Sequence, residues 1–543
     1  MADPRDRFAW HPEPELIGYI DATTSRAALE RLAVDTWATA LDFLYEHAAL
    51  RAMGDPSPYA TIRASFFGER GGPAPAPAEP SPIADVLSEF QDRLAGGQMN
   101  AQHPRQFGYF TPPPLPVSMM GELLAQVTNQ GVDVWHAGPL ATFVEEEVVR
   151  WLCDLVGYGP ESFGLLTSGG VMANFMGMAL ARDIHLGRVL GAGRPPRGGM
   201  LDGVRVYTSD QTHFSIARAL DELGFPPETL VVLPSDDRFR LHAAPVASAV
   251  ARDRAAGLHP FAIAAVAGST NTGSVDAIGE LAELARREDL WLHIDAAYGA
   301  AARLSSRDAA RVADLERADS VTVDPHKWLF QAYDIGGLMV RDGTTLARAF
   351  GGRRPEYYRA GHGPEGGNGT GRGNPAAAGA AGAADSEDDG HGAADQLNFW
   401  RLGFEGTRRW RALKLWLSWK HVGSEGFARL VEANMDLAQH LAARIAASTD
   451  FEALPADPPL SVVCFRHLPD GRPAPAPGSA AATALDAHQD RLQHSLEASG
   501  EGWVSTTRLR GATWLRAGIL NTQSTTEDVD DLLEILRRLA RDD

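Results

Sequence analysis

The chain has 543 residues, 44% of them hydrophobic, a length and composition that suit two or three packed units with a sizeable core. Its 70 acidic residues outnumber its 50 basic residues, which gives a net charge of −20 without any long basic block. We therefore expect neither nucleic acid nor an anionic membrane as a partner.

The amino terminus mixes charges with prolines and lacks the basic start and apolar segment of a secretory signal. The most apolar run, FAIAAVAG at 261–268, has the length of a buried strand, whereas a membrane helix needs roughly 20 residues. Cys153 and Cys464 lie in separate apolar segments, which predicts buried thiols in a reducing compartment and no metal site. We expect a soluble, cytoplasmic protein.

Residues 1–105 are expected to form a mainly helical arm or dimerisation segment. A large domain is expected at 106–360, and a smaller α+β domain at 396–543. Between them, residues 361–395 are rich in Gly, Ala and acidic residues and bury too little apolar area to offset the entropy of ordering, so we expect a disordered insertion. Its GTGRGN sequence follows no strand, which argues against a dinucleotide-binding loop.

Short apolar runs alternate with amphipathic segments from residue 160 to residue 345, which predicts an α/β fold with a mostly parallel sheet covered on both faces. Strands are expected at 203–209, 229–235, 261–270, 290–297, 320–326 and 336–342, and helices at 214–224, 243–257 and 278–289. Polar residues just past the carboxyl ends of such strands line the ligand crevice. Those residues are Asp210 and His213, Ser269 and Thr270, Asp295, and His326 with Lys327.

After residue 400 the pattern predicts further helices and a few strands. Helices are expected at 408–422, 426–448 and 525–542, and strands at 460–468, 502–509 and 512–520. The last helix is expected to open on a Thr cap, with Glu527 three residues after Ser524.

Four strand-end features point to chemistry, although each has an ordinary structural explanation. Lys327 ends a buried strand, where an ammonium group is costly unless it is paired, exposed or used, for example as a Schiff base to a carbonyl cofactor. Asp295 could keep a pyridine nitrogen protonated, and the small residues after it leave room for a flat ring. Gly169 and Gly170, with the hydroxyl of Ser168, open an apolar helix and could hold a phosphate. His213 could stack on an aromatic cofactor.

These features occur in one chain order and lie within longer motifs: TSGG followed by AN, DQTHFSIARA, AGSTNTGSVDAI, HIDAAYGA and DPHKW. With them the sequence resembles the pyridoxal-phosphate-dependent group II amino acid decarboxylases, of the aromatic-amino-acid and glutamate decarboxylase type. The resemblance extends over residues 100–535. It implies the aspartate-aminotransferase fold, known as fold type I, and a homodimer with active sites at the subunit interface.

The resemblance also implies roles for single residues. Lys327 would hold pyridoxal 5′-phosphate covalently, Asp295 would pair with its ring nitrogen, and His213 would stack on the ring. Tyr357, in RRPEYYRAG, matches the loop tyrosine that returns a proton to carbon in this family, with Tyr358 as an adjacent rival. The remaining cofactor-binding residues would be Ala297, Thr270, His326, Ser168, Gly169 and Gly170.

Two departures from the family pattern stand out. Val171 occupies a position that is commonly serine, so it can offer the phosphate only its backbone N–H. The insertion at 361–395 directly follows the segment that carries Tyr357 and could alter loop closure.

The expected reaction is decarboxylation of an L-amino acid to an amine. FGYF at 107–110, together with Trp135 and His136, resembles pocket segments of the family and favours an aromatic substrate. An acidic or aliphatic substrate, carbon–carbon lyase or oxidative deaminase chemistry, and a non-catalytic paralogue remain alternatives.

Overall fold

The computed structural model describes most of the chain, and the described residues divide into two compact units. The first unit comprises Met1–Gly108, Arg472–Leu515 and Gln523–Asp543, and the second comprises Tyr109–Gly471 and Arg516–Thr522. The domain boundaries expected from the sequence remain predictions. The described residues are 26–46, 53–68, 71–79, 81–91, 97–351, 397–471, 473–476 and 478–542.

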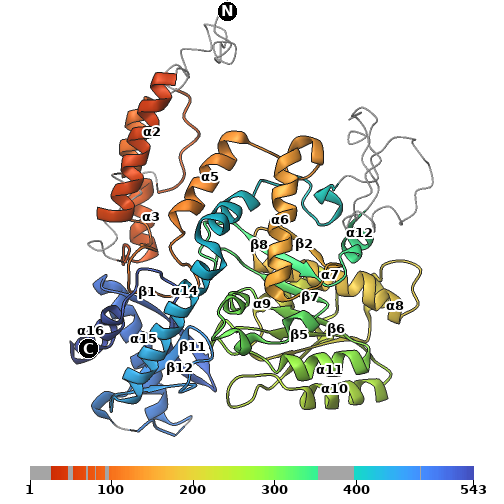
Figure 1. The fold of residues 1–543 in the computed structure, drawn as a ribbon. Coiled ribbons are helices and arrows are strands. Elements are labelled where there is room, and N and C mark those ends of the chain that lie inside the picture. Colours follow the sequence, from red (N-terminus) through yellow and green to blue (C-terminus); the bar gives the residue numbers. More distant parts are fainter. Residues whose placement is uncertain are drawn as a thin grey trace, which may run out of the picture. The chain divides into compact units, whose positions relative to one another are not determined.

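A seven-stranded sheet with the order β2-β8-β7-β6-β5-β3-β4 forms the centre of the second unit (Figure 1). Neighbouring strands are parallel, except that β8 runs antiparallel to β2 and β7. All residues of β2, β6, β7 and β8 are buried, so both faces are covered there, and the predicted sheet is confirmed. The strands are Phe163–Thr167 (β2), Val204–Ser209 (β3), Leu230–Leu233 (β4), His259–Val266 (β5), Trp291–Asp295 (β6), Ser320–Val323 (β7) and Gly336–Val340 (β8).

Helices connect these strands where the sequence predicted them. In α11 the buried residues Ile278, Leu281 and Ala285 recur every three or four positions and form the apolar face of a helix that contacts β5 and β6. Helix α7 contacts β7 and β8, and α9 packs on α7. The helices between these strands are Gly170–Leu180 (α7), Gly187–Val189 (α8), Phe214–Glu222 (α9), Ala243–Ala255 (α10) and Ile278–Glu288 (α11), and Thr344–Phe350 (α12) follows β8.

Three longer helices complete the second unit: α5 (Pro116–Thr128), α6 (Pro139–Val156) and α14 (Ala412–Ala446). Helix α14 contacts both of the others. Gly423, with φ 71° and ψ 163°, interrupts α14, so the two helices predicted in this region are confirmed. A short antiparallel pair, Phe451–Ala453 (β9) and Val462–His467 (β10), follows.

The first unit combines helices with a few strands. Strand β1 runs parallel to β11, and β11 neighbours β12, whose last residues belong to the second unit. The cap predicted for the final helix is confirmed at Thr525, but its partner is Asp528, whose carboxylate accepts the Thr525 N–H at 2.9 Å, and not Glu527. The elements are Arg26–Leu41 (α2), Tyr59–Phe67 (α3), Ile83–Glu89 (α4), Gln106–Phe107 (β1), Ala480–Ser499 (α15), Trp503–Leu509 (β11), Ala512–Gly518 (β12) and Thr526–Asp542 (α16).

Two sequence expectations about apolar segments can be compared with the described residues. Cys153 and Cys464 are both buried and free, as predicted. No helix in the described part of the chain is both long enough and apolar enough to cross a bilayer.

The contact between α5 and α14 depends on the absence of a side chain at Gly121. A Cβ built at this position would lie 2.5 Å from the Cα of Lys414, a backbone atom that cannot rotate away. Gly187, another buried helical glycine, offers a matched comparison, because a Cβ there would meet nothing closer than 3.5 Å.

We therefore expect Gly121→Ala to lower the melting temperature, at a cost of about 1–3 kcal/mol in the free energy of unfolding from overpacking. Gly187→Ala should leave the melting temperature unchanged or raise it, since alanine is favoured over glycine in helices by up to about 1 kcal/mol. Thermal melts followed by circular dichroism test both changes. Equal melting temperatures for Gly121→Ala and the unaltered protein would contradict the prediction.

Candidate active site

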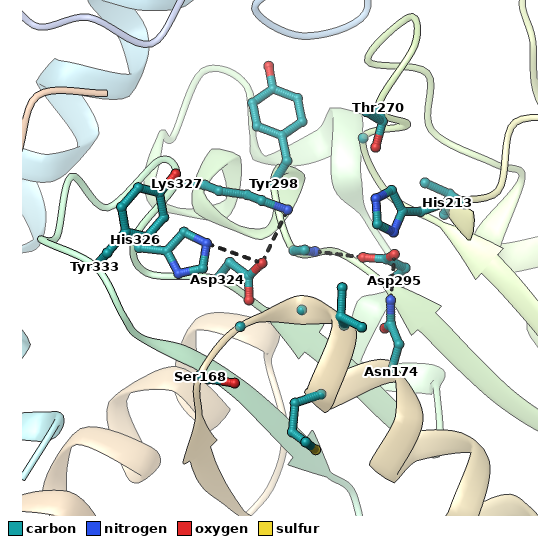
Figure 2. Close-up of a pocket in the computed structure, with 17 residues that line it drawn as sticks. Ser168, Asn174, His213, Thr270, Asp295, Tyr298, Asp324, His326, Lys327 and Tyr333 are labelled. Atoms are coloured by element: carbon teal, nitrogen blue, oxygen red, sulfur yellow. Dashed lines mark hydrogen bonds and ion pairs between the residues drawn. The ribbon is translucent and has the colours of Figure 1, made fainter. Parts of the chain in front are cut away.

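The carboxyl ends of β2, β3, β5, β6 and β7 surround one cavity of about 360 Å³ in the second unit (Figure 2). Parallel strands end at the same edge of a sheet, so residues far apart in the sequence meet there. Asp210 and Ser269 also follow strands but do not line the cavity. All nine residues expected to bind a cofactor line it: Ser168, Gly169, Gly170, His213, Thr270, Asp295, Ala297, His326 and Lys327.

The ammonium group of Lys327 is paired with a buried carboxylate. Its Nζ lies 3.1 Å from Oδ2 of Asp324, whose side chain is 2% exposed. The other oxygen of Asp324, Oδ1, is buried and has no hydrogen-bond partner among the described residues. Asp324 belongs to the motif DPHKW, but the sequence does not show that its side chain turns toward the lysine. The pairing compensates the cost of burying both charges.

His326 is held in one neutral form. Its Nδ1 lies 2.6 Å from the carbonyl oxygen of Ile335, which can only accept, so Nδ1 carries the proton. Burial lowers the pKa of His326, against the opposing effect of Asp324. The Nε2 atom lies 3.7 Å from Oδ2 of Asp324, beyond hydrogen-bond distance. His326 therefore lines the cavity as a neutral ring with a lone pair on Nε2.

Asp295 ends β6 with a buried carboxylate that accepts two hydrogen bonds. Its Oδ1 accepts the backbone N–H of Ala297 at 3.1 Å, and its Oδ2 accepts Nδ2 of Asn174 at 2.8 Å. Hydrogen bonds to the charged form favour that form. A charged acceptor at this position suits a protonated ring nitrogen. Sequence reasoning missed Asn174, although it belongs to the AN pair of the first motif.

His213 is the N-cap of α9, immediately before its first residue. Its Nδ1 lies 2.8 Å from Oγ of Ser215 and accepts the Ser215 backbone N–H at 3.4 Å. Burial lowers the pKa of His213; the Asp295 carboxylate opposes this shift, and the Lys327 ammonium adds to it. The imidazole is therefore neutral near pH 7.

The glycine turn before α7 is required by close packing and not by unusual backbone angles. A Cβ at Gly170 would lie 2.7 Å from Oδ2 of Asp324, and one at Gly169 would lie 3.2 Å from the His326 ring. Neither glycine adopts the left-handed conformation. Val171 follows the turn and lines the cavity, so the start of α7 presents backbone N–H groups there.

Thr270 is held by an arginine that sequence reasoning also missed. Nε of Arg516 donates to the carbonyl oxygen of Thr270 at 2.7 Å, and the guanidinium lies 4.5 Å from the ring centroid of Phe110. Arg516 is buried, and burial lowers its pKa. More than 240 residues separate it from Thr270 in the sequence, so no local pattern could have joined them.

Aromatic side chains line one part of the cavity, but they are not the ones expected. Tyr298 and Tyr333 line it, whereas residues 107–110, Trp135 and His136 do not. Phe110 instead stacks behind Tyr298, with ring centroids 4.4 Å apart. The FGYF segment therefore does not line the cavity, but its Phe110 contacts Tyr298, which does.

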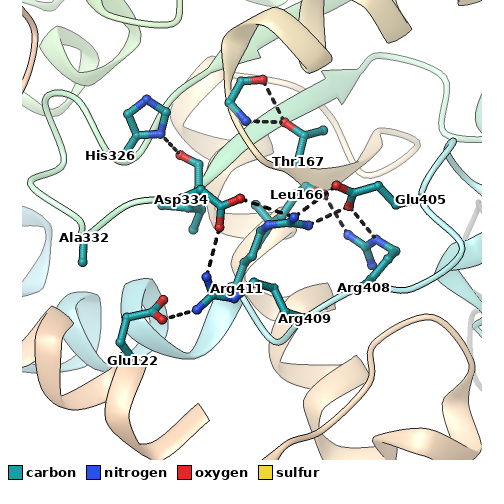
Figure 3. A network of polar contacts seen from close by, with 12 residues as sticks. Glu122, Leu166, Thr167, His326, Ala332, Asp334, Glu405, Arg408, Arg409 and Arg411 are labelled. Atoms are coloured by element: carbon teal, nitrogen blue, oxygen red, sulfur yellow. Dashed lines mark hydrogen bonds and ion pairs between the residues drawn. The ribbon is translucent and has the colours of Figure 1, made fainter. Parts of the chain in front are cut away.

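A partly buried ionic network holds the segment that carries Tyr333 (Figure 3). Nζ of Lys414 donates to the carbonyl oxygens of Ala332 at 2.8 Å and Asp334 at 3.1 Å, on either side of Tyr333. The Asp334 carboxylate pairs with Arg409 at 3.2 Å. These contacts fix the backbone on both sides of the tyrosine.

A second buried pair in the same network fixes the end of β2. Arg408 and Glu145, which are almost fully buried, form an ion pair. Arg408 also donates to the carbonyl oxygen of Leu166 at 2.8 Å, and Glu145 accepts the Leu166 N–H at 3.2 Å. Leu166 lies just before the glycine turn, so this pair fixes the backbone that leads into it.

The remaining candidates, Tyr357 and Tyr358, lie outside the described residues.

Comparison with known proteins agrees with this arrangement. The conserved domain of pyridoxal-dependent decarboxylases matches residues 69–362 and 386–468. An aromatic-L-amino-acid decarboxylase of Bacillus atrophaeus is 32% identical over 84% of this chain and 85% of its own length. An L-2,4-diaminobutyrate decarboxylase of Rhizobium meliloti (strain 1021) is 30% identical over 88% of this chain and 87% of its own length. The crystal structure of mouse CSAD has a TM-score of 0.81 at 23% identity and covers 95% of this chain and 99% of its own.

The structural similarity shows that the second unit has the type I fold of pyridoxal-phosphate enzymes, as the sequence predicted. The matched residues make up more than half of the chain, which confirms the resemblance found in the motifs. The chain belongs to the pyridoxal-dependent decarboxylase family and is a pyridoxal-phosphate-dependent amino acid carboxy-lyase.

Proposed function

We propose that this enzyme converts an aromatic L-amino acid into the corresponding amine and carbon dioxide, with pyridoxal 5′-phosphate bound covalently to Lys327. One observation carries the proposal: the amine of Lys327, the carboxylate of Asp295, the neutral ring of His213 and the glycine turn all face one cavity. The family match supports the reaction type. The residue roles and the substrate class are the proposed part.

The cavity fits this cofactor in size and in the groups it presents. Its volume of about 360 Å³ lies within the usual range for small-molecule sites. The start of α7 supplies N–H donors for a phosphate, at a turn where a Cβ on Gly170 would strike Asp324. Asp295 supplies a charged acceptor for a ring nitrogen, and Lys327 supplies the amine.

The bound cofactor supplies an electron sink, since its protonated ring can accept the electron pair left on the α-carbon when carbon dioxide departs. Asp295 keeps the ring nitrogen protonated in this proposal. His213 would contact one face of the ring and Ala297 the other, which would orient the ring relative to the substrate. The other proposed contacts are those of Thr270, His326, Ser168, Gly169 and Gly170.

We assign the return of a proton to the α-carbon to Tyr357, with Tyr358 as the alternative. A tyrosine hydroxyl within reach of the substrate can act as a general acid. The assignment rests on the motif RRPEYYRAG alone.

Two observations favour an aromatic substrate. The Bacillus relative, a decarboxylase of aromatic L-amino acids, is 32% identical to this chain. The rings of Tyr298 and Tyr333 line the cavity, and aromatic rings favour stacked or edge-to-face contacts with one another. Because the Rhizobium relative is an L-2,4-diaminobutyrate decarboxylase with 30% identity, L-2,4-diaminobutyrate is the alternative substrate to test.

We also propose that the enzyme is a homodimer. Large apolar side chains are exposed on two helices of the second unit: 56% for Leu123 and 74% for Val127 on α5, and 76% for Leu140 and 50% for Phe143 on α6. Exposed apolar surface of this kind is typical of protein interfaces. Sedimentation velocity at micromolar concentration should give twice the mass of the 58.3 kDa chain. A monomer that decarboxylates at full rate would contradict the proposal.

The purified enzyme, supplied with pyridoxal phosphate, should show a visible absorbance band and release amine from aromatic L-amino acids. Lys327→Ala should lack both, because it removes the amine that holds the cofactor. Lys420→Ala, which removes an exposed lysine paired with Glu147, is the control and should keep both. Amine release mainly from L-2,4-diaminobutyrate would overturn the aromatic assignment. Cofactor binding without carbon dioxide release would indicate another reaction or a non-catalytic paralogue.

Tyr357→Phe should lower amine formation by about 100- to 10,000-fold, the usual contribution of general acid catalysis. In air it should also raise the share of aldehyde, hydrogen peroxide and ammonia, because the unprotonated carbon lasts longer and can lose two electrons to dissolved oxygen, which becomes hydrogen peroxide, before water releases the aldehyde and ammonia. Tyr358→Phe is the matched control and should change neither quantity. The reverse result would assign the role to Tyr358, and equal products from both variants would remove the tyrosine from the proposal.

A further inference from the structure

The side chain of Asn174 lies on α7 between two groups that line the cavity, and all its polar contacts are used. The residue is 1% exposed. Its Nδ2 lies 2.8 Å from both Oδ2 of Asp295 and Oγ of Ser215. Its Oδ1 lies 2.9 Å from Nε2 of His293 and 2.6 Å from Oγ1 of Thr322. An amide has two N–H donors and one oxygen with two lone pairs, so this side chain is saturated.

Asp295 decides which way this amide points. An ionised carboxylate can only accept hydrogen bonds, so the group 2.8 Å from it must be the NH₂ of Asn174. The opposite orientation would place two acceptor oxygens against each other in a buried site. The Oδ1 atom of Asn174 must therefore face His293 and Thr322.

This orientation sets the direction of the hydrogen bonds behind Asn174. Burial lowers the pKa of His293 to about 4, so its ring is neutral and has one N–H. That N–H is at Nε2, which donates to Asn174. Its Nδ1 accepts the hydroxyl of Ser320 at 2.8 Å, and Ser320 in turn accepts Nε1 of Trp291 at 3.0 Å. In this series of hydrogen bonds, from Trp291 through Ser320 and His293 to Asn174, every donor faces an acceptor.

The same orientation sets the hydrogen bonds on the cavity side. Asn174 donates its second N–H to Oγ of Ser215, so the Ser215 hydroxyl proton is available for Nδ1 of His213, 2.8 Å away. The backbone N–H of Ser215 points to the same nitrogen. Nδ1 of His213 is therefore an acceptor, and the neutral ring carries its proton on Nε2.

The helix can hold Asn174 in this position because Gly177 has no side chain. A Cβ at Gly177, three residues further along α7, would lie 2.6 Å from the ring of His293. The close approach of α7 to β6 lets the amide reach both Asp295 and His293.

We propose that Asn174 is a positioning residue that acts on two cofactor-binding groups at once: it holds the Asp295 carboxylate as a charged acceptor and fixes His213 in the form protonated at Nε2. The inference rests on the proposed binding of pyridoxal phosphate at Lys327. The cofactor dissociation constant of cofactor-free protein tests it, measured by tryptophan fluorescence from pH 6 to pH 9 and expressed as the ratio of variant to unaltered protein.

Asn174→Leu removes the donor to Asp295 and leaves a similar volume. We expect the dissociation constant to rise by about 10- to 100-fold, by analogy with the loss seen when the hydrogen-bond partners of metal ligands are removed. The ratio should increase further as the pH falls, because a carboxylate with fewer donors has a higher pKa and is protonated more readily.

Asn174→Asp, which is nearly isosteric, should show the opposite trend. At low pH the introduced carboxyl is protonated and can donate its one proton to Asp295, although it has no second proton for Ser215, so the ratio should be smallest there. As the pH rises, two carboxylates at this distance cannot both be charged without repulsion, and the ratio should increase. The charged groups around His213 and Asp295, namely Lys327, Asp324 and Arg218, are the same in both variants.

Asn434→Leu is the matched control. Asn434 is also a buried amide, bonded to Nε1 of Trp328 and to the carbonyl oxygen of Asn521, but it does not contact Asp295 or His213. This variant should melt at a lower temperature and show a ratio that does not change with pH. If Asn174→Leu does not fold, the trend of Asn174→Asp decides alone.

The outcomes separate this inference from the proposed function. Opposite pH trends for the two Asn174 variants, with none for Asn434→Leu, would support the positioning role. A ratio independent of pH in both Asn174 variants would overturn it and leave Asn174 a structural residue. If the unaltered protein does not bind pyridoxal phosphate, or if Lys327→Ala binds it equally well, the proposed function itself fails.

Discussion

Two carboxylates, Asp295 and Asp324, are buried in the wall of one small cavity, and the site depends on keeping both of them charged. Burying a charged carboxylate is costly unless hydrogen bonds or an opposite charge compensate it. The chain compensates the two in different ways: Asp295 accepts two N–H donors, and Asp324 pairs with the ammonium of Lys327. Asp295 is therefore available to accept a hydrogen bond from a ring nitrogen, while Asp324 pairs with the amine of Lys327. The neutral donors of Asn174 and Ala297 leave Asp295 with its full negative charge, which a cationic partner would have offset.

The sheet and its glycines bring these groups close enough to act together. A Cβ at Gly336, the first residue of β8, would lie 2.5 Å from the Cα of Gly169 and 2.6 Å from Oδ1 of Asp324. The glycine turn, the start of β8 and the carboxylate therefore pack directly against one another. A side chain at either glycine would push the start of α7 away from Lys327. Close contact at these glycines thus fixes the glycine turn beside the Asp324 carboxylate.

The sequence predicted the sheet well because a sheet of this kind depends on local patterns, and the residues proposed for cofactor binding lie around one cavity. Alternating apolar runs and amphipathic segments predict a doubly covered parallel sheet, and parallel strands bring residues such as His213, Asp295 and Lys327 to one edge. The contacts that support these residues could not be predicted in this way. Asn174 meets Asp295 across 121 positions, and Arg516 meets Thr270 across 246, so only the packed fold shows either contact.

The expected aromatic pocket shows a related limit. Residues 107–110 resemble a pocket segment of the family and were expected to favour an aromatic substrate, yet Phe110 packs behind Tyr298, which lines the cavity itself. An aromatic residue contributes to a core as readily as to a binding site, so its type does not decide between the two. Tyr333 lines the cavity because Lys414 fixes the carbonyl groups on either side of it, a contact that no local pattern of residues indicates.

The charges that line the cavity limit how a phosphate can be held there. Among the described lining residues there are two aspartates, one lysine and no arginine, and both histidines have lowered pKa values that keep them neutral near pH 7. A phosphate dianion would therefore bind beside lining residues whose net charge is already negative. Its binding must depend on the backbone N–H groups and the dipole at the start of α7. The N–H of Gly169 already donates to Oγ1 of Thr167 at 3.3 Å, so the phosphate would depend on the N–H groups that follow it, and Val171 can serve through its backbone where a hydroxyl is commonly found.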